Sequence, residues 1–274
     1  MAAGRQGLAG YVATTRRVLL RERASRLGDR LRGYEERLVF VVGAPRSGTT
    51  FLADAIGRVP GFVDLTEVTP LKAAIPELAP LADDEAARRI RSILERVRLL
   101  ALVRGLRGVE QTPETSFVLS AALRAYPHAR AVHVVRDGRD VVSSLLERGW
   151  LSRHRSGRDD ARHPYGPSPR FWVDKGAAEF ARESDAARAA LAWRAYVCAA
   201  RSLRDQVCEV RYEELPSAAA RIAQHLGADT APLAAALGHF RDASVGRFER
   251  DLSPTQLADV ERVAGPLLRE LGYA

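Results

Sequence analysis

The sequence predicts an α/β fold, with a central parallel β-sheet flanked by helices. The first observation is that short apolar runs rich in β-branched residues alternate with longer stretches of helical periodicity, as expected for strands joined by crossover helices. The second is that the two clearest strands, 38–42 (LVFVV) and 131–135 (AVHVV), are apolar almost throughout. Such strands are typical of a parallel sheet with both faces covered.

Further elements follow the same alternation. We expect additional strands at 62–65, 107–111 and 207–212. Helical periodicity predicts helices at 8–33, 49–58, 71–81, 84–102, 139–148 and 185–204. The first of these helices is basic, and we therefore divide the chain into a basic N-terminal helical segment, residues 1–36, and a single domain, residues 37–274.

One stretch, 152–170, interrupts the alternation. It is rich in Pro, Gly and Arg and has no apolar period, so we expect a long loop there. The sequence leaves open whether this loop is a lid over a substrate or a segment without fixed structure. Trp150, Phe171 and Trp172 flank the loop and are expected either to form an apolar wall for a substrate or to pack in the core.

Composition favours an anionic ligand without identifying it. Of the 274 residues, 42 are Lys or Arg and 34 are Asp or Glu, which gives a formal charge of +8. Such a surface attracts nucleotides, sulfated or phosphorylated substrates, nucleic acids or membranes. No apolar run reaches the roughly 18 residues of a membrane span, and the first residues lack the apolar stretch of a signal peptide. We therefore expect a cytoplasmic protein without a transmembrane segment.

The two cysteines, Cys198 and Cys208, have no CxxC or His-rich neighbourhood. We expect both in the core, because free cysteines are usually buried. The sequence thus indicates no metal site.

The segment GAPRSGTT, which directly follows the first clear strand, has the spacing of a phosphate-binding loop. Gly43 and Gly48 allow backbone amides to approach phosphate oxygens, and the helix that follows adds its positive end. Thr49 stands where nucleotide-hydrolysing proteins have the lysine that bridges the terminal phosphates of a triphosphate. Thr49 in place of this lysine argues against an ATPase or kinase. Arg46 supplies a cation elsewhere in the loop.

A second pair of residues, Arg136 and Ser144, follows the strand at 131–135. Both are expected at the carboxyl edge of the sheet, where open α/β sheets bind ligands. An Arg with a Ser hydroxyl can hold a second phosphate. Two alternatives remain open: Arg136 in a structural ion pair with Asp137 or Asp140, and Ser144 as an ordinary helical serine.

Together these motifs resemble those of the sulfotransferases that use 3′-phosphoadenosine 5′-phosphosulfate (PAPS). The 5′-phosphosulfate loop of that family, PxSGTT, is matched by Pro45, Arg46, Ser47, Gly48, Thr49 and Thr50. Its 3′-phosphate motif, an Arg eight positions before a Ser, is matched by Arg136 and Ser144. The resemblance implies a P-loop-type sulfotransferase fold and is closer to the bacterial and tyrosylprotein branch.

Weaker matches occur in the same order as in the family. They are Thr112-Pro113, AWR at 192–194, RYEEL at 211–215 and SVGRF at 244–248. In the last of these, Gly246 and Arg247 match the element that closes over the 3′-phosphate in the family.

The resemblance implies transfer of a sulfuryl group from PAPS to a hydroxyl of a small-molecule acceptor, in preference to an amine, with release of adenosine 3′,5′-bisphosphate (PAP). It assigns the general base to Glu67, with Asp64 in reserve, and charge stabilisation to Arg46 and the loop amides. No metal is required. The sequence departs from the family at Gln111, where relatives often have a Lys that supports the transferring group.

Two other functions remain as alternatives at this point. One is a nucleotide or small-molecule kinase of the same fold, against which Thr49 argues. The other is a basic module that associates with nucleic acid or membranes through the N-terminal helix. The acceptor and the oligomeric state are not readable from the sequence, and a homo-oligomer is compatible with it.

Overall fold

The computed structural model describes residues 2–21, 33–168, 170–173 and 176–273. Five parallel strands form one sheet in the order β2-β3-β1-β4-β5. The strands are β1 (Val39–Val42), β2 (Phe62–Thr66), β3 (Arg107–Glu110), β4 (Arg130–Val135) and β5 (Val207–Arg211). The predicted fold class and all five predicted strands are therefore confirmed, with ends that differ by one residue at most.

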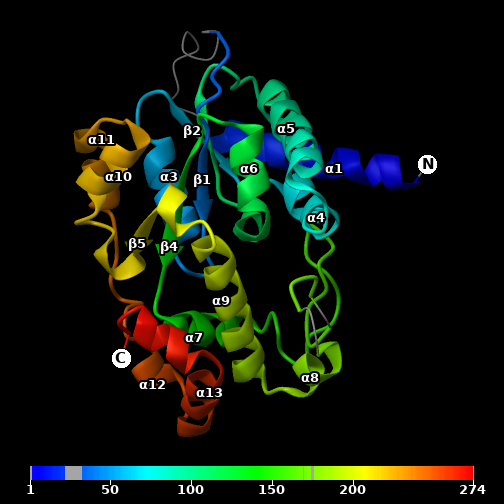
Figure 1. The fold of residues 1–274 in the computed structure, drawn as a ribbon, viewed down its shortest axis with the longest axis vertical. Coiled ribbons are helices and arrows are strands. Elements are labelled where there is room, and N and C mark those ends of the chain that lie inside the picture. The colour runs from blue at the N-terminus through cyan, green and yellow to red at the C-terminus, as the bar shows by residue number, and fades with distance from the viewer. Residues whose placement is uncertain (1, 22–32, 169, 174–175, 274) are drawn as a thin grey trace.

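Helices cover both faces of this sheet (Figure 1). On one face lie α1 (Ala2–Arg21), α4 (Thr69–Leu78), α5 (Asp83–Leu100) and α6 (Leu119–Ala125). On the other face lie α3 (Thr49–Gly57), α10 (Ala219–Leu226) and α11 (Thr230–Leu237). Beyond the carboxyl ends of the strands lie α7 (Gly138–Arg148), α8 (Ala177–Arg182), α9 (Asp185–Arg201), α12 (Phe248–Asp251) and α13 (Pro254–Glu270). The chain also contains short 3₁₀ turns at Pro113–Val118, Arg204–Gln206 and Tyr212–Glu214.

Strand β1 shows why the sequence is apolar at every position there. Phe40 and Val42 are fully buried under α5 and α6, whereas Val39 and Val41 are fully buried under α3 on the opposite face. Successive side chains of a strand point to opposite faces, so a strand covered on both sides needs apolar residues throughout.

A third core lies below the carboxyl edge and joins α7, α9 and α13. Trp193, Tyr196 and Val197 are its largest contributions from α9, spaced by three and four residues as one face of a helix requires. Cys198 lies on the other side of α9 and is exposed, so its predicted burial is wrong. Cys208, on β5, is buried as expected.

The basic N-terminal helix packs on the domain. Val18 and Thr14 of α1 are fully buried, and the Thr14 hydroxyl accepts a hydrogen bond of 3.2 Å from the Thr69 amide at the start of α4. Arg21 pairs with the buried Asp64 of β2. Part of the predicted helix at 8–33, residues 22–32, lies outside the described residues. None of the helices described is long and apolar enough to cross a membrane.

The start of α4 and the end of α9 differ from the boundaries predicted by the sequence. Helix α4 begins two residues early, at Thr69, because Pro70 in its first turn has the fixed backbone angle that suits a helix start. Helix α9 ends at Arg201 and is followed by a 3₁₀ turn instead of continuing to Arg204. The helices after Tyr212 were not predicted.

The turn between β1 and α3 is fixed by a close contact with the end of β5. Gly48, the residue before α3, has a φ angle of 93°, in the left-handed region that favours glycine. A Cβ atom added at Gly48 would overlap the ring of Tyr212. The loop therefore requires glycine here for two independent reasons.

We predict that Gly48→Ala destabilises the protein by about 2–5 kcal/mol, since it combines left-handed backbone strain with overpacking against Tyr212. The matched control is Gly61→Ala, because Gly61 has a similar φ of 86° but open space around its Cβ position. It should cost only about 1–2 kcal/mol. Urea unfolding measures both, and an equal loss for the two variants would contradict the proposed role of the Tyr212 contact.

Candidate active site

The carboxyl edge of the sheet gathers one polar side chain from the end of each strand. Arg46 follows β1, Glu67 follows β2, Gln111 follows β3, Arg136 follows β4 and Tyr212 follows β5. Strand β1 lies between β3 and β4, which is the point where the direction of strand order reverses. Ligands of open α/β sheets bind at this position.

The loop from Gly43 to Gly48 presents its backbone toward this edge. Gly43 passes so close to β4 that a Cβ atom would lie 2.5 Å from the Val134 carbonyl oxygen. The Ser47 amide closes the turn on the Ala44 carbonyl at 3.1 Å, and Arg46 itself has a left-handed φ of 73°. The amides that open α3 have no side-chain cap, so this helix start is available to an anion.

Arg46 joins the two predicted phosphate motifs. Its Nε donates a hydrogen bond of 3.1 Å to the Ser144 hydroxyl, and its carbonyl accepts one of 3.1 Å from the Arg136 guanidinium. Arg136 and Ser144 share no hydrogen bond with each other, but each contacts Arg46. Arg46 thus connects Arg136 and Ser144, which were expected to meet at this edge and do so only through Arg46.

Arg136 is fixed from several sides. Its guanidinium carbon lies 4.6 Å from the centre of the Tyr212 ring, and its carbonyl accepts a hydrogen bond of 3.1 Å from the Trp193 indole. It also donates to the Ser244 carbonyl and lies 3.6 Å from the Asp140 carboxylate. The structural ion pair with Asp140, left open by the sequence, exists alongside the other contacts.

The segment around Gly246 packs against the start of α7. Asp140 accepts hydrogen bonds from the amides of Gly246 and Phe248, at 2.9 and 3.0 Å. Arg247 points to Asp251 and to Glu147, at 2.5 and 3.1 Å. Both predicted residues of this segment thus lie near Arg136, but with their polar groups already engaged by the protein.

The electrostatics of Arg46 distinguish it from an ordinary surface arginine. Burial lowers the pKa of its guanidinium, and the nearby cations Arg148, Arg136 and Arg247 lower it further. No carboxylate of the described residues lies within 4 Å of Arg46. A cation that faces a cavity without a carboxylate beside it is stabilised by an anionic ligand.

A cavity of about 850 Å³ opens in front of Arg46. It is bounded by the loop after β1, by the turn after β2, by α4, by the predicted long loop and by Gly7 of α1. The predicted site residues among its lining are Pro45, Arg46, Thr49, Thr50 and Glu67. Ser47, Gly48, Arg136, Ser144, Gly246 and Arg247 lie outside the lining.

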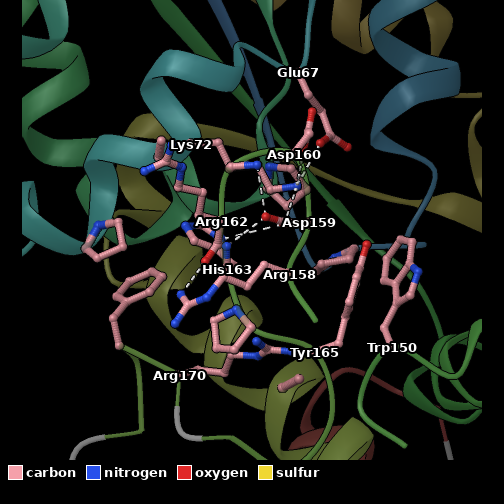
Figure 2. Close-up of a pocket in the computed structure, with 18 of the residues that line it drawn as sticks. Glu67, Lys72, Trp150, Arg158, Asp159, Asp160, Arg162, His163, Tyr165 and Arg170 are labelled. Carbon is pink, nitrogen blue, oxygen red and sulfur yellow. Dashed lines mark hydrogen bonds and ion pairs between the residues drawn. The ribbon is translucent and has the colours of Figure 1, made fainter. Parts of the chain in front are cut away.

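Glu67 faces the cavity and is paired with Lys72 of α4 (Figure 2). Lys72 Nζ lies 3.1 Å from Glu67 and 3.3 Å from Asp159 of the long loop. Burial lowers the pKa of Lys72, but the carboxylates of Glu114, Glu67 and Asp159 outweigh it and raise this pKa above its usual range. Lys72 is therefore a permanent cation shared by the two carboxylates.

The backbone around Glu67 is held by two separate elements. Arg17 of α1 donates hydrogen bonds of 2.8 Å to the Glu67 carbonyl and 2.7 Å to the Thr69 hydroxyl. The Thr112 hydroxyl accepts one of 3.0 Å from the Val68 amide, which gives the Thr-Pro motif a structural role. These contacts fix the turn that carries Glu67.

Asp64, the reserve base candidate, is placed differently. Its carboxylate is buried under α1, pairs with Arg21 and accepts a hydrogen bond of 2.7 Å from the Thr66 amide. Burial raises the pKa of Asp64. Asp64 does not line the cavity, so the geometry favours Glu67.

Gln111, at the position of the family lysine, binds the phosphate loop. Its side-chain oxygen accepts a hydrogen bond of 3.2 Å from the Thr50 hydroxyl. The preceding Glu110 is fully buried and accepts bonds from the Thr112 amide and the Thr115 hydroxyl, at 2.7 and 2.9 Å. Burial raises the pKa of Glu110 to about 7.

The predicted loop at 152–170 closes one side of the cavity. Besides Asp159, its residue Asp160 accepts a hydrogen bond of 3.0 Å from Thr69 and lies 3.5 Å from Arg17. Its residue His163 lies 3.7 Å from the buried Glu114. Position 169 lies outside the described residues. The described part of the loop is thus attached to α1, α4 and the turn after β3.

The apolar wall of the cavity is aromatic. Trp150, Phe171 and Trp172 all line it, together with Tyr196 of α9. The Tyr196 hydroxyl donates a hydrogen bond of 3.1 Å to Glu114. All three flanking residues therefore line the cavity and also pack against a core, Trp150 and Trp172 against the third core and Phe171 against the core under α4, α5 and α6.

A family model described as the sulfotransferase family matches residues 71–232, more than half of the chain. The chain belongs to the sulfotransferase family. No curated protein sequence matches it. The matched residues of this sulfotransferase begin after the loop at 43–48 and after Glu67, so the match itself does not include these two candidate site elements.

Three solved sulfotransferase structures share the fold. A domain from the curacin biosynthetic pathway is 12% identical, with a TM-score of 0.54 over 86% of this chain and 98% of that one. STF9 from Mycobacterium avium is 16% identical, with a TM-score of 0.52 over 89% and 79%. Mouse SULT7A1, solved in complex with PAP, is 18% identical, with a TM-score of 0.51 over 90% of both chains.

Four charged residues in or beside the cavity were not predicted from the sequence: Lys72, Glu114, Asp159 and Arg17. Lys72 and Glu114 each lie a few residues beyond a predicted site residue, and that proximity was a usable signal. Arg17 and Asp159 gave no signal, because each is one arginine or aspartate among many in a charged segment and acts only through tertiary contacts.

We predict that Arg17→Met destabilises the turn after β2, since it removes the hydrogen bonds to Glu67 and Thr69. The expected loss is about 1–2 kcal/mol in urea unfolding, with faster hydrogen exchange in peptides covering residues 64–72. Arg16→Met, on the exposed side of the same helix turn, is the control and should change neither. Unaltered exchange in Arg17→Met would mean that α1 does not hold this turn.

Proposed function

We propose that this sulfotransferase transfers a sulfuryl group from PAPS to a hydroxyl of a small-molecule acceptor bound in the cavity. The observation that carries the proposal is Arg46, a cation without a carboxylate within 4 Å among the described residues, which belongs to the loop after β1 and lines the cavity that contains Glu67. A donor anion and an acceptor hydroxyl would meet at this point.

Binding of the donor is assigned to the two motifs. The amides of Ser47 to Thr50 and the start of α3 would hold the 5′-phosphosulfate. Arg136 and Ser144 would hold the 3′-phosphate, with Gly246 and Arg247 closing over it. The PAP complex of the mouse relative supports a donor of this type, since the two chains share the fold.

In the proposed reaction, the acceptor oxygen attacks sulfur while the bond between sulfur and the bridging phosphate oxygen breaks. Glu67 accepts the hydroxyl proton as general base, an effect of typically about 10²- to 10⁴-fold. Arg46 and the loop amides stabilise the charge that grows on the departing 5′-phosphate. Gln111 offers only a neutral hydrogen bond, so Arg46 and Lys72 are the cations closest to the reaction.

The direct test is incubation of the full chain with PAPS labelled at sulfur and a panel of hydroxylated acceptors, including simple phenols, sugars and nucleosides. We expect a labelled product and release of PAP. Absence of transfer to every acceptor, with binding of ATP and magnesium in preference to PAP, would favour a kinase instead.

Replacing the proposed base is the sharpest test of the mechanism. Glu67→Gln should lower kcat about 10²-fold or more while PAP affinity remains within about twofold, because the proton acceptor is lost but the donor site is intact. Glu85→Gln, an exposed change on α5, is the control for the isosteric substitution. Full turnover by Glu67→Gln would assign the base role to another group.

Removal of Arg136 tests the second phosphate site. Arg136→Ala should weaken PAP binding by about 1.5–3 kcal/mol in calorimetry, the range for hydrogen bonds to charged groups. The same variant should bind adenosine 5′-phosphate almost as the parent does. Arg130→Ala, at the exposed opposite end of β4, removes the same charge away from the site and should leave both affinities unchanged. Unaltered PAP affinity in Arg136→Ala would remove Arg136 from the donor site.

A further inference from the structure

Among the described residues, burial lowers the pKa of four arginines, Arg46, Arg107, Arg170 and Arg188. Two of these arginines have hydrogen-bond or ion-pair partners within the protein. Arg107 donates to two backbone carbonyls, and Arg188 pairs with Asp185 and donates to the Leu151 carbonyl. The other two, Arg46 and Arg170, line the same cavity. Arg46 is assigned to the donor, which leaves Arg170 without a partner.

Arg170 is a cation without a nearby counter-charge in the described part of the chain. No carboxylate there lies within 4 Å of it, and its Nη1 atom is shielded from solvent without a hydrogen-bond acceptor. Asp159 and Glu114 offset its charge from further away, but Asp159 is paired with Lys72, and Glu114 with Tyr196 and His163. Because Arg170 lines the cavity without a carboxylate beside it, an anion bound in the cavity would balance its charge.

Aromatic side chains line the same cavity as Arg170. Phe171 and Trp172 follow it directly and are half-exposed in the cavity. Phe117 holds Phe171 and Tyr196 in edge-to-face contacts, with ring centres 5.1 and 4.8 Å apart. This packing fixes the rings in place before any ligand binds. A preformed aromatic wall favours a ligand with a flat aromatic body.

The cavity is lined by several charged groups, and Glu67 and Arg170 lie apart among them (Figure 2). Glu67 and Arg170 lie at opposite edges of the view in Figure 2, with His163 between them. Lys72 already balances the carboxylates at the Glu67 end. A ligand that spans the cavity would therefore present a neutral hydroxyl to Glu67 and a negative charge to Arg170.

We propose that the acceptor is an aromatic hydroxy acid, whose carboxylate binds Arg170 and whose ring contacts Phe171 and Trp172. This inference rests on the proposed function. A carboxylate fits better than a phosphate, because one guanidinium balances one negative charge and its planar donors match the two carboxylate oxygens.

The test uses a para-hydroxyphenyl carboxylate and its uncharged primary amide, which share ring and hydroxyl. Calorimetry on the complex with PAP and turnover with PAPS are measured for both. We expect the carboxylate to bind about 10- to 100-fold more tightly than the amide and to have a kcat/KM higher by the same factor. Arg170→Gln should reduce this preference to less than about threefold while leaving PAP affinity unchanged.

Arg153→Gln is the control, because Arg153 is an exposed arginine of the same loop outside the cavity lining. It should retain the full preference for the carboxylate, which excludes a general effect of net charge. Equal binding of acid and amide by the parent protein, or an unchanged preference in Arg170→Gln, would overturn the inference. If the protein still bound PAP and sulfated the amide, the proposed function would stand without the inference. If it neither bound PAP nor transferred a sulfuryl group to either compound, the proposed function and the inference would both be overturned.

Discussion

The ring of Tyr212 packs against the backbone of Gly48 on one loop and lies beneath the guanidinium of Arg136 on another. Its hydroxyl also lies 3.2 Å from the Ser244 hydroxyl, in the segment that contacts Arg136. One side chain at the end of β5 therefore sets the distance between the loop after β1 and the arginine after β4. Because Arg46 bonds to both Ser144 and Arg136, its position depends on this contact as well. The proposed anion site therefore depends on packing at the sheet edge rather than on any single charged residue.

The acceptor side of the site depends on a shared cation instead. Lys72 binds Glu67 and Asp159 at once, and Arg17 contacts both the Glu67 carbonyl and Asp160. The turn that carries the proposed base and the loop that closes the cavity are thus joined twice. Movement of the loop would change the surroundings of Glu67, because Glu67 and Asp159 of the loop share the ammonium group of Lys72. In the proposed reaction, this coupling would link closure around the acceptor to the state of Glu67.

The parallel sheet, its five strands and the phosphate loop could be predicted from the sequence, because apolar runs and glycine spacing are local signals. The position of Arg136 and Ser144 at the carboxyl edge could also be predicted, since both follow the strand at 131–135, but their contacts with Arg46 could not. The contacts of Asp159 with Lys72 and of Arg17 with the turn after β2 could not be predicted, because they join segments far apart in the chain. Lys72, in contrast, lies only five residues after Glu67. Exposure of Cys198 was missed because α9 is apolar on nearly all sides, so periodicity did not identify its buried face.

The central claim is that the edge of the sheet holds two separate phosphates of one nucleotide. The most direct measurement is calorimetric titration of the full chain with PAP and with adenosine 5′-phosphate, which differ only in the 3′-phosphate. The account predicts that PAP binds at least about tenfold more tightly, with an advantage that diminishes as salt is added. Equal affinity for the two nucleotides would contradict it, since Arg136 and Ser144 would then have no phosphate to bind.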